Sequence, residues 1–297
     1  MANLRDVRLR MRAIQQTLQV TKAMNLISTA KLRKGRRFLE DTEPYFTRIQ
    51  KSMFDILSGA RMEHSKFLEA RESIGSDGSS RTAIVVITSD KGLAGGYNAN
   101  IFRQVNQLCA QVNNPVLILI GAIGYRYFVH SPWLILENFS FKSRLPDLDD
   151  AKEIAEYIVS QYLWGMFSEV HIIYTHMYSS IKLLPRERQI LPLNEKKMQE
   201  EFEKSGQKRV ELQFEYLPSR TEVFESLVPM YVKGIIYGSL VEAYVSEQSA
   251  RMAAMDEASK SAADMLASLQ IHYNRVRQAS ITQEMTEIIG GAAALSE

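Results

Sequence analysis

The residues best placed to do chemistry form a glycine-rich loop, SDKGLAGGYN at 89–98, between a predicted strand and a predicted helix. A glycine loop in this place can hold phosphate on its backbone N–H groups. Its spacing, G-x-x-G-G, differs from the dinucleotide-binding pattern G-x-G-x-x-G and from a Walker A loop with its Lys-Ser/Thr ending. Nucleotide binding is therefore the weaker interpretation of this loop. A tight structural turn or a contact surface is favoured.

The other side chains that could bind a metal or act as an acid or base are scattered. His171 and His176 lie five residues apart on a predicted strand, so they face opposite sides and cannot hold one ion. The aspartates of DLDD at 147–150 precede a predicted helix, where N-capping accounts for them. The single cysteine, Cys109, excludes a disulfide framework and a thiolate metal site, and it reads as a core residue. We predict no catalytic residue, no metal site and no cofactor.

Two long helical segments flank this central part of the chain. In the first, apolar residues recur at alternating steps of three and four, namely Leu4, Val7, Met11, Ile14 and Leu18. In the C-terminal segment, residues recur at the same steps of three and four, namely Met255, Ala258, Ala262, Met265, Leu269, Tyr273 and Val276. Such spacing is typical of a coiled-coil seam, and helices this long need a partner in water. We predict that residues 3–58 and 222–290 form one antiparallel coiled coil.

The C-terminal end of the second helix is unusually apolar. Chain ends are normally polar, yet Ile281, Met285 and Ile288 lie on a face rotated away from the seam, where Gln283 takes the next position. The N-terminal helix is expected to end before it reaches this part of the C-terminal helix. The last twenty residues or so are therefore predicted to protrude, with their apolar faces covered by another protein.

The middle of the chain alternates strands with helices, which favours a parallel-leaning, Rossmann-like α/β sheet. Strands are predicted at 82–88, 115–121, 169–178 and 209–218, and helices at 99–112 and 148–165. The predicted domains are an N-terminal coiled-coil helix at 1–60, a linker at 61–81, a central α/β domain at 82–220 and a C-terminal coiled-coil helix at 221–297.

Charge is concentrated at the N-terminal end, although the net charge of the whole chain is only +2. Residues 1–37 contain ten Lys or Arg and one acid, and the segment KLRKGRR at 31–37 is the densest part. This segment has three interpretations: a solvated helix face, a nucleic-acid contact, or contact with an acidic protein surface. No aromatic residue interleaves the charges and no groove-binding motif accompanies them, so the protein contact is favoured.

Neither a membrane span nor a removable leader is predicted. The longest apolar run, about 116–123, is far shorter than the roughly 20 residues that a bilayer requires. The arginine-rich opening resembles a transit peptide, but its apolar pattern continues past Leu18, so we interpret it as mature protein.

Both ends of the chain carry motifs of one family. TKAMNLISTAKLRK at 21–34, SEQSARMAAMDEASK at 246–260 and YNRVRQASITQEMTEIIGGAAA at 273–294 resemble the signature regions of the gamma subunit of F-type ATP synthases. SDKGLAGGYNANIF at 89–102 is similar to that family's central loop. The resemblance implies a non-catalytic central rotor stalk that couples ion flow through the c ring to ATP synthesis or hydrolysis in the catalytic beta subunits. Its implied partners are the alpha, beta and epsilon subunits and the c ring.

The resemblance also assigns roles to individual residues. Contact with the beta subunits near their moving lever is implied for Lys22, Met24 and Arg251, and contact with the upper catch for Gln278, Thr282 and Glu284. The acidic lever itself would face Lys31, Arg33, Lys34, Arg36 and Arg37. An apolar sleeve at the top of the alpha–beta ring would hold the tip, Met285, Ile288, Ile289 and Leu295.

The resemblance further implies a peripheral protein on the cytoplasmic face of a bacterial inner membrane, with no direct membrane insertion, no nucleic-acid partner and no cofactor. Plant chloroplast members carry a redox switch of paired cysteines, which one cysteine rules out. The stretch at 131–148 matches no motif, and the coupling ion is selected by other subunits. Two alternatives stay open on the residues alone: a nucleotide-binding α/β protein with a coiled-coil arm, and a basic coiled-coil protein that binds nucleic acid.

Overall fold

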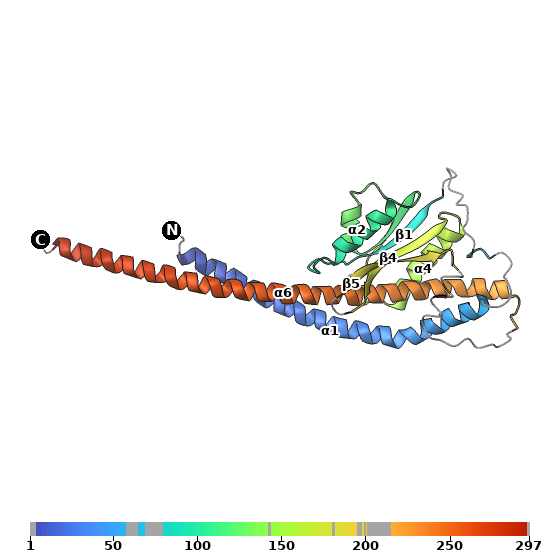
Figure 1. Cartoon of the computed structure of the whole chain (residues 1–297), viewed down its shortest axis with the longest axis horizontal. Helices are drawn as coiled ribbons and strands as arrows, with labels where there is room; N and C mark the ends of the chain where they lie inside the picture. The colour runs from blue at the N-terminus through green and yellow to red at the C-terminus, as the bar shows by residue number, and fades with distance from the viewer. Residues whose placement is uncertain are drawn as a thin grey trace. The chain divides into compact units, whose positions relative to one another are not determined.

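The computed structural model describes residues 4–57, 65–68, 80–141, 144–179, 182–194, 198, 200 and 215–295. Its elements, in chain order, are α1 (Leu4–Leu57), β1 (Thr82–Ile87), α2 (Tyr97–Cys109), β2 (Pro115–Ile120), α3 (Ala122–Phe128), β3 (Leu134–Phe139), α4 (Leu148–Leu163), β4 (Glu169–Met177), β5 (Leu183–Leu191) and α6 (Arg220–Leu295) (Figure 1). Most of the predicted linker at 61–81 and residues 209–214 of the fourth predicted strand lie outside the described residues. Residues 215–218 form no strand.

The chain divides into two compact units, one made of 1–29 with 251–297 and the other of 30–250. Both long helices contribute to both units. The domain boundaries predicted from the sequence, at the ends of the long helices, stay a prediction.

In the first unit, α1 and α6 pack side by side in opposite directions. Arg8 donates to the Tyr273 hydroxyl at 2.7 Å, Ser259 donates to the Thr21 hydroxyl at 2.8 Å, and the side-chain amide of Asn25 donates to the Met252 carbonyl at 3.0 Å. As residue numbers rise along α1, those of its partners fall along α6. The antiparallel pairing predicted from the two apolar stripes is therefore confirmed for this unit.

The seam of α6 differs from the predicted one at a single position. Met265 is 48% exposed, and the half-buried Leu266 lies on the inner side instead. Met255 and Ala262 are buried as expected. Because 3.6 residues make one turn, a step of four after Ala262 keeps the stripe aligned, whereas a step of three rotates it outward. Met265 is thus available on the outer surface.

The register predicts a disulfide between the two helices. Thr21 and Ser259 lie opposite each other on the two helices. Because the helices are antiparallel, Leu18, three residues before Thr21, lies near Ala262, three residues after Ser259. The pair Leu18→Cys with Ala262→Cys should therefore oxidise readily in the isolated chain. Disulfide geometry requires close α-carbons, and the small Ala262 allows the helices to approach. A non-reducing gel with peptide mapping measures the product.

The matched control for this cross-link is Leu18→Cys with Ala263→Cys, because Ala263 is exposed one residue further round the helix. Its thiol should not reach the other helix. Equal cross-linking of both pairs would show that the helices slide or rotate against each other, and the register above would then be wrong.

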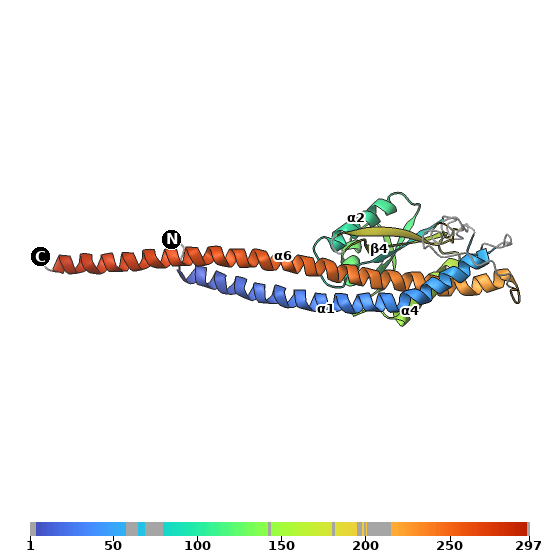
Figure 2. The same ribbon diagram turned by 60° about the horizontal axis from the view of Figure 1, so that its bottom comes forward.

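The second unit is built on a five-stranded sheet of order β3-β2-β1-β4-β5. All neighbouring strands are parallel except β5, which runs antiparallel to β4. Every residue of the central β1 is buried, as expected for a strand covered on both faces. Figures 1 and 2 show α2 on one side of the sheet, and α4 with the 30–250 part of the helix pair on the other.

The predicted strands at 82–88, 115–121 and 169–178 and both predicted helices are confirmed, with ends shifted by one to three residues. Two edge strands were not predicted. β3 lies inside the unmatched stretch 131–148, and β5 carries Pro185, Arg186, Glu187 and Arg188. Proline and charged side chains are tolerated at sheet edges, where one side of the strand makes no ladder hydrogen bonds. Such strands lack the apolar run that reveals a central strand.

Candidate partner-binding surfaces

The glycine-rich loop that follows β1 is held by its own polar side chains. The side-chain oxygen of Asn98 accepts from the Ser89 backbone N–H at 3.1 Å, and the side-chain amide of Asn98 donates to the Ser89 hydroxyl at 2.7 Å. Asp90 accepts from the Ala122 backbone N–H at 3.0 Å and from the Ser140 hydroxyl at 3.2 Å. These bonds tie the loop to α3 and to the end of β3. They indicate a tight structural turn, one of the two favoured interpretations.

The carboxyl edge of the sheet, where Rossmann-like folds bind nucleotides, is filled by α6 in this molecule. The cavity between Thr88, Gly121 and the α6 residues Ala243 and Glu247 is about 50 Å³, whereas small-molecule sites usually need about 300 Å³ or more. The Tyr97 hydroxyl donates to the Ala243 carbonyl at 3.1 Å and fixes α2 against α6. This packing argues against the nucleotide-binding alternative at the glycine loop.

Gly121 shows why this edge is so tight. Its φ is +103°, and a β-carbon there would lie 2.3 Å from the Thr88 carbonyl oxygen. A residue other than glycine would be strained and would collide with backbone. Glycine therefore allows the backbone after β2 to approach the end of β1 closely.

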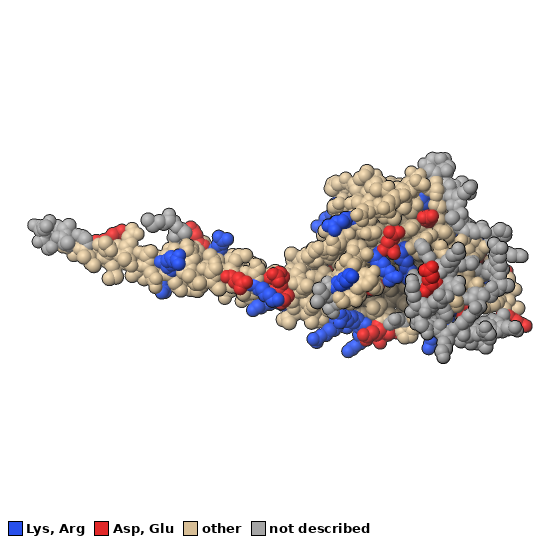
Figure 3. Space-filling model, in the orientation of Figure 1, with Lys and Arg blue, Asp and Glu red and all other residues tan. Residues whose placement is uncertain are grey.

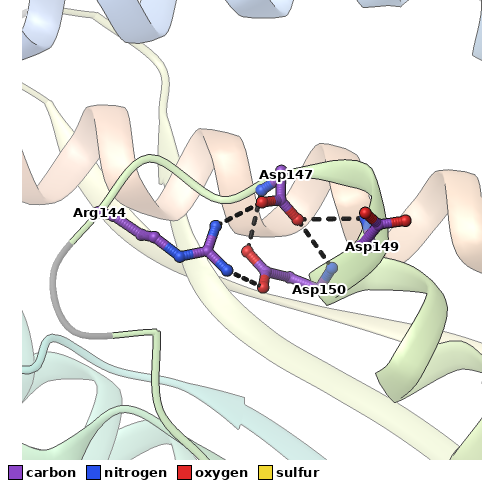
Figure 4. A network of polar contacts seen from close by, with 4 residues as sticks. All are labelled: Arg144, Asp147, Asp149 and Asp150. Carbon is purple, nitrogen blue, oxygen red and sulfur yellow. Dashed lines mark hydrogen bonds and ion pairs between the residues drawn. The ribbon is translucent and has the colours of Figure 1, made fainter.

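The aspartates before α4 cap that helix, as predicted (Figure 4). The Asp147 carboxylate accepts from the backbone N–H groups of Asp149 at 3.1 Å and Asp150 at 3.0 Å, and Asp150 accepts in return from the Asp147 N–H at 3.0 Å. Arg144 forms ion pairs with both Asp147 and Asp150. The N–H of Asp150 holds the pKa of the Asp147 carboxyl below its usual range. The cluster has a structural role.

The two strand histidines have separate partners. His171 lies 3.1 Å from a Glu187 carboxylate oxygen and 3.2 Å from one of Glu169, while His176 pairs with Glu242 on α6. The prediction that they do not share an ion fits this arrangement. Within the described ranges, no group of three His, Cys, Asp or Glu could hold a metal.

The basic segment of α1 turns its charges outward. Leu32 and Gly35 take the buried side, and a β-carbon at Gly35 would lie 2.8 Å from a Val245 methyl group. The charged side chains therefore spread over the remaining surface: Lys31 is half-buried, and Arg33, Lys34, Arg36 and Arg37 are exposed. Figure 3 shows Lys and Arg mixed with Asp and Glu on the visible face, so no uniform basic track for nucleic acid is seen there.

The residues implied as beta-subunit contacts differ in accessibility. Lys22 is exposed and Met24 is half-buried, and on α6 Gln278, Thr282 and Glu284 are exposed. Arg251 is only 7% exposed. A partner contact by Arg251 would have to use the small surface that remains.

The C-terminal end of α6 continues beyond the N-terminus of α1 (Figures 1 and 2). Among the side chains that the structure describes, Ser280 is the last half-buried one, and those of residues 281–289 are exposed throughout. This stretch carries Ile281, Met285, Ile288 and Ile289, and Ile288 is 71% exposed. The Leu295 side chain lies outside the described part. The predicted apolar tip therefore has no cover among the described residues of this chain.

A second set of exposed apolar residues on the same unit was missed from the sequence. Leu26, inside the motif at 21–34, is 71% exposed, and the set comprises Leu9, Val20, Leu26, Ile27, Met265 and Ile271. The sequence could have indicated this set, because Leu26 and Ile27 lie off the buried seam that runs through Thr21 and Ser28. Large apolar patches on a surface usually mark protein contacts.

None of the described helices is long and apolar enough to cross a membrane.

Comparison with known proteins identifies the family of this chain. The family model described as ATP synthase matches residues 3–295. The ATP synthase gamma chain of Ruminiclostridium cellulolyticum is 42% identical over 294 residues, 99% of both chains. That of Acetivibrio thermocellus is 40% identical over 297 residues, 99% of this chain and 100% of the relative. The sodium-ion-specific gamma chain of Acetobacterium woodii is 34% identical over 99% of both chains.

Solved structures share the fold at low sequence identity. A chain of the Euglena gracilis mitochondrial ATP synthase, in its OSCP/F1/c-ring structure, superposes with a TM-score of 0.68 at 18% identity, covering 98% of this chain and 94% of that one. A chain of the Tetrahymena thermophila central stalk/c-ring structure gives 0.58 at 23% identity, covering 81% and 99%. Together with the full-length match to the family model and to the bacterial relatives, these findings show that this chain belongs to the ATP synthase gamma-chain family.

Proposed function

We propose that this chain is the central rotor stalk of an F-type ATP synthase, which couples ion flow through a c ring to ATP synthesis or hydrolysis in catalytic beta subunits. The observation that carries the proposal is the uncovered apolar end of α6 at 281–289. Its side chains resemble an interface rather than a solvent-facing helix end. A ring of alpha and beta subunits that encloses the helix would cover them.

The helix pair suits transmission of torque. Two antiparallel helices, bonded through Arg8–Tyr273 and Thr21–Ser259, bend less easily than one. The outward apolar residues of this unit, including Leu26 and Ile27, offer contact area without fixed hydrogen bonds. A surface of this kind allows rotation inside a sleeve, because no particular bond must break at each angle.

Contacts at particular angles would come from the polar residues. Lys22, Met24 and Arg251 would meet the beta subunits near their lever, and Gln278, Thr282 and Glu284 would meet the upper catch. The basic residues 31–37 would face the acidic lever. The α/β domain would dock on the epsilon subunit and on the c ring, so the chain would lie peripherally at the cytoplasmic face of a bacterial membrane. Nucleotide chemistry would belong to the beta subunits.

A single-molecule rotation assay tests this proposal. The chain carrying Arg126→Cys, at an exposed site on α3, is assembled with the alpha and beta subunits of the same organism, and the complex is fixed to glass through the beta subunits. A bead attached to the introduced thiol should turn in one direction when ATP is added. The natural Cys109 should not take the label, because it is buried and burial raises the pKa of its thiol to about 12.

The parent chain without the introduced cysteine is the control for labelling and should bind no bead. A complex that assembles and hydrolyses ATP while its bead stays still would overturn the rotor assignment. Failure of the chain to assemble with the alpha and beta subunits would do the same.

A further inference from the structure

A shallow, open hollow lies on the outward side of α2, on the face of the sheet opposite α4 (Figures 1 and 2). Its lining includes Phe102, Arg103, Asn106 and Gln107 of α2 and Tyr127 of α3. Small-molecule sites usually enclose most of their ligand, which an open hollow cannot do. Its shape therefore suits contact with another protein.

The aromatic rings at this hollow are held in place by the fold. Phe102 and Tyr127 stack with their ring centroids 4.0 Å apart and their planes 5° apart. The Asn106 side chain donates to the Tyr127 hydroxyl at 3.3 Å and accepts from the Trp133 indole N–H at 3.1 Å. Tyr127 is nevertheless 46% exposed. A ring fixed in this way loses little conformational freedom on binding, which favours a contact surface.

The charges around the hollow are of one sign. Residues 91–136 contain no Asp or Glu, whereas the whole chain has 34. The Lys and Arg of this stretch are Lys91, Arg103 and Arg126, and all three are exposed. Neither Arg103 nor Arg126 pairs with a carboxylate among the residues that the structure describes. This stretch would therefore attract, and not repel, a partner that presents carboxylates.

The hydroxyl of Tyr127 adds a donor beside these charges. It accepts a bond from Asn106, so it keeps its own hydrogen to donate to a further acceptor. Arg103 lines the same hollow, and a guanidinium group can only donate. Two donors next to an exposed ring match a carboxylate that lies close to an apolar side chain.

We propose that the hollow between α2 and α3 binds an acidic segment of a partner protein. An apolar side chain of that segment would lie against the Phe102–Tyr127 pair, and its carboxylates would pair with Arg103 and accept from the Tyr127 hydroxyl. Charge complementarity decides the kind of partner. Nucleic acid fits less well, because its binding requires a denser cluster of Lys and Arg than this stretch provides.

The test uses the complex assembled from this chain and the other subunits of the same organism, so it rests on the proposed function. Gln107→Cys, at an exposed site in the hollow, is labelled with a photoreactive group and leaves the proposed contacts unchanged. Illumination and peptide mapping should give an adduct on a protein segment that combines Asp or Glu with an apolar residue. Arg48→Cys, exposed on α1, is the matched control and should not give this adduct.

Variants of the hollow then measure the contact in solution. The subunit that carries the adduct is purified and titrated into the full chain at low ionic strength. Arg103→Glu should weaken binding about tenfold or more, because it sets like charges against each other, whereas Arg103→Lys keeps the charge and should stay within about threefold of the parent. Tyr127→Phe should weaken binding severalfold, because it removes only the donor. Arg48→Glu reverses an exposed charge elsewhere and should bind as the parent does.

The proposal is wrong if the assembled complex gives no adduct at Gln107→Cys, or an adduct only with lipid or with a segment that lacks carboxylates. Equal affinity of the parent and Arg103→Glu would contradict it as well. Saturable binding of a single-stranded oligonucleotide to the parent, lost in Arg103→Glu, would assign the face to nucleic acid instead. A chain that does not assemble contradicts the proposed function, and this inference with it. A chain that assembles without an adduct contradicts this inference alone.

Discussion

Charge reversal of the five basic residues of the 31–37 segment should clearly impair ATP-driven ion pumping in reconstituted membranes, whereas Arg33→Ala alone should leave it close to normal. The reversed set is Lys31, Arg33, Lys34, Arg36 and Arg37. Because the helix turns Leu32 and Gly35 inward, these charges spread around its outer surface. We expect them to act together as one positive electrostatic field. Exposed ion pairs contribute only about 0–1 kcal/mol each, so the loss of one is small. Five reversed charges would oppose the acidic lever at every angle.

The measurement is ATP-driven pumping of protons or sodium ions, compared with ATP hydrolysis and with the yield of assembled complex. A set with all five residues changed to alanine is the matched control and should fall between the parent and the charge-reversed chain. If Arg33→Ala alone abolishes pumping in a fully assembled complex, the field explanation is wrong. By contrast, single substitutions of Arg251 or Gln278 are expected to lower pumping, because a contact made at one rotational angle depends on a specific hydrogen-bonding geometry.

Enlarging the buried alanine of the seam should weaken the helix pair. Ala262 is 5% exposed, and Ala262→Leu adds three carbons where α1 and α6 touch, at a typical overpacking cost of about 1–3 kcal/mol. Chemical denaturation of the isolated chain measures this loss. In the assembled enzyme, the ratio of pumping to hydrolysis should drop more than the yield of complex. The half-buried Ala258 should show the same trend in Ala258→Leu, with a smaller effect.

Ala263→Leu is the control for this experiment, since Ala263 is the exposed neighbour and a leucine there meets solvent. It should leave the free energy of unfolding within a few tenths of a kcal/mol of the parent, as is usual for surface substitutions. A stable Ala262→Leu chain with normal coupling would mean that the seam runs through a different face of α6.

Helix length and the pairing of the two ends could be predicted from sequence, because a long apolar stripe at steps of three and four has few other ways to leave water. Met265 shows the limit of that reasoning. Steps of three and four fit the same stripe locally, and only the packed partner decides that Leu266 points inward. The central strands were equally clear, since their apolar runs are buried on both faces. The aspartate cap of α4 was predictable because capping depends on neighbouring residues alone.

Features that depend on distant residues appeared only in the tertiary structure. β3 and β5 are edge strands whose mixed composition conceals them, and their pairing with β2 and β4 defines them. Arg188 looks like an ordinary surface charge until β5 places it beside Tyr231 of α6. The filled edge at the glycine loop depends on contact with Ala243, far along the chain. Sequence by itself determined the family, the two long helices and the apolar tip, because those signals are local or periodic; tertiary structure decided register, edges and cavities, because these arise where segments remote in sequence meet.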